Sequence, residues 1–244
     1  MIMNNPEIRA IIVAAGKGNR LYPLTEDVPK CLLEVGGRTI LERELELFQI
    51  FGIKDTVVIS GYKSEKVREL LKEKVRHVFN PFFQTSNSVV SLWLASRYLD
   101  KPVLIINGDV LLDKGILADL LESREDICMV VDKKECGDED YKVKVENSRI
   151  VDMGKTIPQK GVYGEYIGLT KTSAAGSAQM AEMLELLMKK MEFTTWYETA
   201  YLEIVKRGNP IPFTETKGRY WTEIDYVEDL KAARKYFEQN EKNP

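Results

Sequence analysis

Short apolar runs alternate with helical patterns through the first half of the chain, and this rhythm constrains the fold more than any other feature. The apolar runs occupy residues 10–15, 56–60, 75–79 and 103–106. Helical patterns occupy residues 41–51 and 65–74, and a third helix, capped by Thr85 or Ser86, is expected to run through Ala95. Such alternation predicts an α/β fold, a three-layer sandwich with helices on both faces of a mostly parallel central sheet. Ligands of such sheets bind beyond the carboxyl ends of the strands.

The second half has a different pattern. Alternating residues at 141–146 and 149–151 flank Asn147 and Ser148 and predict a hairpin. We expect a further strand at 164–169 and helices at about 177–191 and 227–237. No linker rich in Gly, Ser or Pro divides the chain, so we predict one domain over residues 1–244, with a nucleotide-type half at about 1–130 and an elaborated half at about 131–244.

Composition excludes several classes of protein. The 35 Lys and Arg against 38 Asp and Glu give a net charge of −3, which argues against a nucleic-acid-coating protein. We find no apolar stretch of membrane-spanning length and no signal-peptide core, so we predict a cytoplasmic protein without membrane insertion. The three cysteines form no CxxC pair, and the single histidine, His77, leaves little from which to build a zinc site or a histidine triad. A homo-oligomer is compatible with this composition.

The loop after the first apolar run carries the strongest functional signal. Gly16 and Gly18 permit a tight turn whose backbone amides can face phosphate, and Lys17, Arg20 and Lys30 supply positive charge. A solvated turn with incidental charges is the alternative, but the combination after a buried strand favours phosphate binding. Two rival phosphate motifs fail. The third glycine of GxGxxG is absent, and the GKT at 154–156 lacks the first glycine of a P-loop.

Two acidic segments are candidate metal ligands. Asp109 ends the sequence Asn-Gly-Asp after the fourth apolar run, where a carboxylate can hold a divalent ion against phosphate. An Asx turn is the alternative for this segment. Glu223 and Asp225 lie two residues apart, on one face of a strand if the segment is extended. Asp225 could instead cap the last helix.

These segments together resemble a known family. Residues 14–30 resemble the G-x-G-x-R…P-K signature of the sugar-phosphate and alcohol-phosphate nucleotidyltransferases, the MobA-like, GT-A-like NTP transferases. The NGD motif and the E-I-D-x-x-x-D-L ending are similar to the cytidylyltransferase branch that acts on phosphocholine, 2-aminoethylphosphonate or inositol phosphate. The resemblance implies a Rossmann-like fold, Mg²⁺ held by Asp109 and Asp225, and phosphate-stabilising, catalytic roles for Arg20 and Lys30.

The resemblance also implies which residues contact each substrate. The expected nucleotide-binding residues are Ala14, Ala15, Gly16, Lys17, Gly18, Asn19, Arg20, Lys30, Tyr62, Ser86, Asn87, Asn107 and Gly108. The expected acceptor-binding residues are Lys155, Glu165, Trp196, Tyr197, Glu198 and Glu223. The first half would then bind the nucleotide and the second half the acceptor. The aromatic residues at 196 and 197 have core packing as their alternative, and a cation over the face of Trp196 would favour an acceptor with an ammonium group.

The resulting hypothesis is a magnesium-dependent cytidylyltransferase. An oxygen of a small phosphorylated or phosphonylated acceptor, of the phosphocholine or 2-aminoethylphosphonate type, would attack the α-phosphorus of CTP in line and release pyrophosphate. Three alternatives stay open: a hexose-1-phosphate uridylyl- or thymidylyltransferase, an inositol-phosphate cytidylyltransferase, and an inactive nucleotide-binding regulator.

Overall fold

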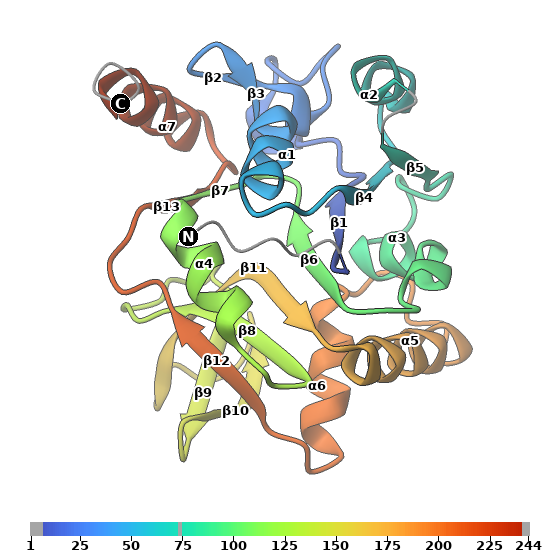
Figure 1. Cartoon of the computed structure of the whole chain (residues 1–244), viewed down its shortest axis with the longest axis vertical. Coiled ribbons are helices and arrows are strands. Elements are labelled where there is room, and N and C mark those ends of the chain that lie inside the picture. The colour runs from blue at the N-terminus through green and yellow to red at the C-terminus, as the bar shows by residue number, and fades with distance from the viewer. Residues whose placement is uncertain (1–6, 73–74, 241–244) are drawn as a thin grey trace.

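The computed structural model describes residues 7–72 and 75–240. Figure 1 shows a central sheet with helices on both sides. The α-helices are α1 (Ile40–Ile50), α2 (Ser64–Leu71), α3 (Ser88–Leu94), α4 (Lys114–Glu122), α5 (Ala174–Lys189), α6 (Glu198–Lys206) and α7 (Val227–Asn240). The strands are β1 (Arg9–Ala14), β2 (Glu34–Val35), β3 (Arg38–Thr39), β4 (Asp55–Ser60), β5 (Arg76–Phe79), β6 (Val103–Asn107), β7 (Val110–Leu112), β8 (Ile127–Asp132), β9 (Lys142–Glu146), β10 (Arg149–Gly154), β11 (Val162–Thr172), β12 (Ile211–Glu215) and β13 (Trp221–Glu223).

The main sheet has nine strands in the order β5-β4-β1-β6-β11-β8-β12-β10-β9. Strands β5, β4, β1 and β6 are mutually parallel, as βαβ crossovers require. Strands β11 and β10 run against the other strands of this sheet. The predicted α/β sandwich with a mostly parallel sheet is therefore confirmed, and the sheet continues without a break from the first half of the chain into the second.

Two apolar layers hold the helices to the sheet. Neighbouring strand residues point to opposite faces, so Ile11 packs in the layer under α3, α5 and α6, and Ile12 packs in the layer under α1, α2 and α4. Helix α1 begins at a capping box, in which Thr39 and Glu42 exchange side-chain-to-backbone hydrogen bonds. The helix directions and the strand ends that form the site are fixed by these contacts.

A third, smaller apolar cluster lies at the edge of the molecule. Leu21, Val35 and Ile40 pack there against Ile224 and Leu230, so the start of α7 is held beside the segment 15–30 that follows β1, which we call the glycine–basic loop. Figure 1 shows α7 and the β2–β3 hairpin close to one another at the same end of the sheet. Residues from both ends of the sequence thereby meet.

Several local predictions differ from the structure. The cap of α3 is Asn87, whose Oδ1 accepts from the backbone N–H of Ser88, and Ser86 instead donates to the carbonyl of Phe82. The predicted helix at 65–74 includes residues 73 and 74, which lie outside the described residues. Helix α4 and strand β12 were not predicted. Among the described helices, none has both the length and the apolar character needed to cross a bilayer.

Candidate active site

A cavity of about 480 Å³ opens at the carboxyl ends of β1 and β6 and extends toward β10, β11 and α6. Most of the predicted site residues line it. The predicted residues in its wall are Ala15, Gly16, Gly18, Asn19, Arg20, Lys30, Ser86, Asn87, Asn107, Asp109, Lys155, Glu165, Trp196, Glu198, Glu223 and Asp225. Residues expected to bind the nucleotide and residues expected to bind the acceptor thus line one cavity.

The glycine–basic loop is bent so that Lys30 faces the cavity. Gly18 has φ +70°, a left-handed conformation that a side chain would strain, and an added Cβ would lie 3.1 Å from the Cβ of Lys30. The hydroxyl of Thr25 donates to the carbonyl of Gly18 at 2.8 Å and closes the turn. Glycine at this position therefore allows the loop to pack directly on Lys30.

Three carboxylates converge at the centre of the site. Asp109 follows β6, Glu223 ends β13 and Asp225 precedes α7, and one oxygen from each lies within 4.8 Å of the others. An added Cβ at Gly108 would come within 2.6 Å of the Cβ of Ala14, so only glycine lets the segment before Asp109 pass this close to β1. Strand β13 pairs with β7, which brings Glu223 beside Asp109.

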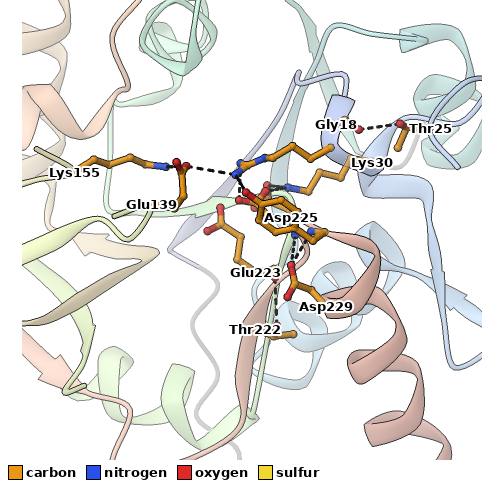
Figure 2. A network of polar contacts seen from close by, with 12 residues as sticks. Gly18, Thr25, Lys30, Glu139, Lys155, Thr222, Glu223, Asp225 and Asp229 are labelled. Atoms are coloured by element: carbon orange, nitrogen blue, oxygen red, sulfur yellow. Dashed lines mark hydrogen bonds and ion pairs between the residues drawn. The ribbon is translucent and has the colours of Figure 1, made fainter. Parts of the chain in front are cut away.

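Lys30 and Arg20 pair with two of these three acids. Lys30 Nζ lies 2.6 Å from Asp109 Oδ2 and 2.5 Å from Asp225 Oδ1, and an Arg20 amino group lies 2.6 Å from Asp225 Oδ2. Burial disfavours the charged ammonium of Lys30, but the two aspartates outweigh it and raise the pKa of Lys30. Figure 2 shows Lys30, Asp225 and Glu223 grouped together, with Asp229 below Asp225 in the view. Lys30 therefore stays protonated as a fixed positive charge.

Both carboxylate oxygens of Asp225 face the site, where they pair with Lys30 and Arg20 instead of the backbone of α7. The Oδ2 of Asp229 accepts hydrogen bonds from the backbone N–H groups of Asp225 and Tyr226 at 3.0 and 2.7 Å. The alternative in which the Asp225 side chain caps the helix is therefore wrong. Asp229, in the first turn of α7, fixes the backbone that carries Asp225.

The cluster of three carboxylates, Asp109, Glu223 and Asp225, fits a hard divalent cation. Burial raises the pKa of Glu223 to about 8, and repulsion from Asp109 and Asp225 adds to this. The buried Oδ1 of Asp109 has no hydrogen-bond partner among the described residues. Oxygen ligands in excess of local positive charge are what Mg²⁺ prefers. Together, these three side chains could therefore bind one such ion.

The residues expected to bind the acceptor form what we call the acceptor side of the cavity, and its first residue, Lys155, directly follows β10. Its ammonium lies 5.2 Å from the ring centroid of Trp196, a cation–π contact, and 3.8 Å from a Glu139 carboxylate oxygen. Glu139 also lies 3.5 Å from Arg20. Figure 2 shows Glu139 between Lys155 and the carboxylates of Glu223 and Asp225. One exposed carboxylate thus joins the cation of the acceptor side to a cation of the phosphate side.

Glu198 lies at the buried end of the acceptor side. It begins α6, is 5% exposed, and burial raises its pKa to about 7, while the Asn107 side chain and Lys155 partly oppose the shift. Gly168 makes room for this contact, because an added Cβ there would lie 2.6 Å from Asn107 Nδ2. Asn107, which was expected to contact the nucleotide, therefore also contacts the acceptor side.

Glu165 is the second buried acid on this side. Its Oε2 lies 2.6 Å from Lys134 Nζ. Burial raises the pKa of Glu165, and Lys134 opposes this shift. Glu165 therefore already has a counter-ion of its own.

Five predicted site residues do not line the cavity: Ala14, Lys17, Tyr62, Gly108 and Tyr197. Tyr62 donates to the carbonyl of Glu26, and the ammonium of Lys17 lies 5.5 Å from its ring, outside the cavity wall. Tyr197 is fully buried and packs against Tyr201. Helical residues point about 100° apart, so consecutive residues at the start of α6 cannot all face one cavity.

The cavity wall also contains residues that the sequence did not single out: Val13, Asn80, Phe83, Ser88, Ser91, Glu139, Tyr141, Tyr166 and Gly168. Two loops that are distant in sequence join here. Ser88 Oγ accepts from the backbone N–H of Tyr197 at 3.0 Å, and the N–H of Asn87 donates to the carbonyl of Phe193 at 2.9 Å. No local motif marks such contacts, because they exist only once the halves have packed.

Comparison with known proteins shows the family to which the chain belongs. Residues 10–240 match the family model described as the MobA-like NTP transferase domain. CTP:phosphoglutamine cytidylyltransferase from Campylobacter jejuni is 28% identical over 92% of this chain and 98% of its own. Choline-phosphate cytidylyltransferase from Streptococcus pneumoniae is 28% identical over 92% of this chain and 96% of its own. The solved structure of CTP:phosphocholine cytidylyltransferase from Streptococcus pneumoniae shares the fold, with a TM-score of 0.78 at 24% identity over 94% of this chain and 99% of that one.

Proposed function

We propose that this chain, which belongs to the family of MobA-like NTP transferases, transfers CMP from CTP to a small phosphorylated or phosphonylated acceptor and releases pyrophosphate. The acceptor would be of the phosphocholine or 2-aminoethylphosphonate type. The names of two relatives that are similar over nearly their whole length, both cytidylyltransferases, support CTP as the donor.

One observation carries the proposal. Two cations, Arg20 and Lys30, and three carboxylates, Asp109, Glu223 and Asp225, meet in one cavity at the carboxyl ends of parallel strands. Phosphoryl and nucleotidyl transfer need charge neutralisation and alignment of two polyanions more than they need a general base. The arrangement provides both signs of charge, and the acceptor-side Lys155 opens on the same space.

The chemistry follows from these charges. An anionic oxygen of the acceptor forms a bond to the α-phosphorus of CTP while the bond to the bridging oxygen of pyrophosphate breaks, so no proton has to be removed first. Arg20 and Lys30 stabilise the negative charge that develops on the phosphates, and Lys155 orients the acceptor phosphate. Asp109, Asp225 and Glu223 would hold Mg²⁺, which when bound supplies Lewis-acid stabilisation of the substrate oxygens.

The test is a pyrophosphate-release assay with the four NTPs, each paired with phosphocholine, 2-aminoethylphosphonate, inositol 1-phosphate and glucose 1-phosphate. We expect release with CTP and an amine-bearing acceptor. Release that depends on glucose 1-phosphate with UTP or dTTP would replace the proposal with a sugar-phosphate transferase. Absence of release with every pair, together with measurable NTP binding, would favour a nucleotide-binding regulator.

A further inference from the structure

The Trp196 end of the acceptor cavity already holds a positive charge. The ammonium of Lys155 lies 5.2 Å from the ring centroid of Trp196. A second cation placed against this ring would be repelled by Lys155, whereas an anionic group would be attracted. The acceptor's phosphate or phosphonate therefore belongs at this end. Glu139 pairs with both Lys155 and Arg20, so this end lies close to the cation that we propose for the phosphates of CTP.

Another part of the cavity wall is acidic and lined by aromatic rings. Tyr141 and Tyr166 line the wall with Glu198. Their two rings lie edge to face, with the ring centroids 6.3 Å apart. The Tyr166 hydroxyl is already hydrogen-bonded to Thr170. Glu198 Oε2 is buried and has no hydrogen-bond partner among the described residues, although the side chain lines the cavity. A buried oxygen without a partner is costly unless a ligand supplies a donor.

From this arrangement we infer that the acceptor carries a primary ammonium group whose N–H donates to Glu198, with its phosphate or phosphonate at Lys155. This inference rests on the proposed function and narrows its acceptor. A quaternary ammonium such as that of phosphocholine has no N–H and leaves Glu198 Oε2 unpaired. Its three methyl groups would also need open aromatic faces, whereas one face of Trp196 is taken by Lys155 and the two tyrosine rings contact each other.

A graded set of ligands tests the inference without requiring turnover. Binding to the wild-type protein in the presence of Mg²⁺ and α,β-methylene-CTP, whose α–β bridge cannot be cleaved, is measured by calorimetry for phosphoethanolamine, its N-methyl and N,N-dimethyl derivatives, phosphocholine, and 2-hydroxyethyl phosphate as the uncharged isostere. We expect phosphoethanolamine to bind roughly ten to a hundred times more tightly than phosphocholine, the range for a hydrogen bond to a charged group. The steepest loss should come at the last methylation, which removes the last N–H.

The result that would overturn the inference is equally plain. If phosphocholine or 2-hydroxyethyl phosphate bound as tightly as phosphoethanolamine, the site would not recognise an N–H donor of the acceptor. Turnover of phosphocholine with CTP would in that case leave the proposed function standing. If no pair of NTP and acceptor gave pyrophosphate release, the proposed function would fall. The binding series would still report on the ammonium site.

A variant assigns the effect to one residue. Glu198→Gln keeps the size of the side chain and removes its charge, so the preference for phosphoethanolamine over phosphocholine should shrink to a few-fold or less. The exposed Glu182, which lies on α5 and pairs with Arg207, provides the matched control Glu182→Gln. CTP affinity and melting temperature confirm that each variant folds. A preference that persists unchanged in Glu198→Gln would assign the discrimination to another residue and overturn the inference.

Discussion

At the scale of single residues, Lys30 joins the acids that we assign to the metal. Its Nζ contacts Asp109 and Asp225 at 2.6 and 2.5 Å, so either acid can be tested while the other still holds the lysine. Asp109→Asn and Asp225→Asn should each lower kcat roughly a hundredfold or more, because charge stabilisation in the transition state is lost. CTP affinity should fall much less. Steady-state kinetics and calorimetry separate the two effects.

The control for this pair is Asp152→Asn, since Asp152 is an exposed acid that lies 3.9 Å from Lys144. It should leave kcat unchanged. Near-normal turnover in either the Asp109 or the Asp225 variant would remove that residue from the metal site.

Glu198 gives a prediction for pH. Its pKa rises from 4.5 to about 7, chiefly through burial, with Lys155, Asp109 and the surrounding tyrosines as its charged or titratable neighbours. A carboxyl whose pKa is raised on folding binds its proton more tightly in the native state. Its contribution to stability is therefore complete below pH 4.5 and is lost as the pH rises through 7. The loss amounts to at most ~3 kcal/mol.

Glu198→Gln has no such proton to lose. Its free energy of unfolding relative to wild type should therefore increase between pH 5 and pH 8, measured by urea denaturation at each pH. The affinity for an ammonium acceptor should rise over the same interval in wild type, because the charged carboxylate becomes populated. A difference between variant and wild type that stays flat with pH would contradict the raised pKa.

At the scale of elements, the start of α3 supports the acceptor side from the nucleotide side. Ser88 Oγ accepts from the N–H of Tyr197, the residue between Trp196 and Glu198. Ser88→Ala leaves this N–H without its partner and should cost about 1 kcal/mol of stability. Because the affected backbone carries two acceptor-side residues, we expect the KM for the acceptor to rise several-fold, with the KM for CTP nearly unchanged.

Ser96→Ala, in the short 3-10 helix after α3, is the control for this substitution and should change neither KM. If Ser88→Ala raised both KM values equally, the hydrogen bond would support the whole cavity rather than its acceptor side.

Elements with a strong local pattern could be predicted from the sequence, and elements that depend on distant partners could not. The buried parallel strands are continuous apolar runs that end at glycine or at polar residues, so β1, β4 and β6 were predicted closely. Strand β12 lies between β8 and β10, and its five residues carry little periodicity of their own. Tertiary pairing, rather than local propensity, makes it a strand.

The same distinction holds for the site. Gly18, Arg20, Lys30 and Asp109 lie in compact motifs, so a shared site for them could be predicted before the fold was known, and all four line the cavity. Glu139 lies in a loop without a motif, and it reaches both Arg20 and Lys155 only because β8, β9 and the glycine–basic loop meet in space. The sequence also placed Tyr197 with its neighbours Trp196 and Glu198, but the turn into α6 points it into the core.

At the scale of the whole molecule, ligand binding should stabilise the entire fold. Lys30, Asp109 and Asp225 come from the start, the middle and the end of the chain, and a third apolar cluster holds the start of α7 beside the glycine–basic loop. A ligand that contacts all three residues can bind only when both ends are in place. Its binding energy therefore adds to the stability of the native state.

Mg²⁺ with CTP at about a hundred times its Kd should contribute about 2.7 kcal/mol, which corresponds to a rise in melting temperature of roughly 5–10 °C for a chain of this length. CTP with EDTA should give a smaller rise, because the three carboxylates then repel the triphosphate without a bridging cation. Asp225→Asn should lose most of the magnesium-dependent part and keep the remainder, whereas Asp152→Asn should behave as wild type. Differential scanning fluorimetry measures all of these shifts. If CTP shifted the melting temperature of the wild type equally with Mg²⁺ and with EDTA, CTP would bind without a metal ion at the three carboxylates. The assignment of Asp109, Glu223 and Asp225 to the metal would then have to be withdrawn.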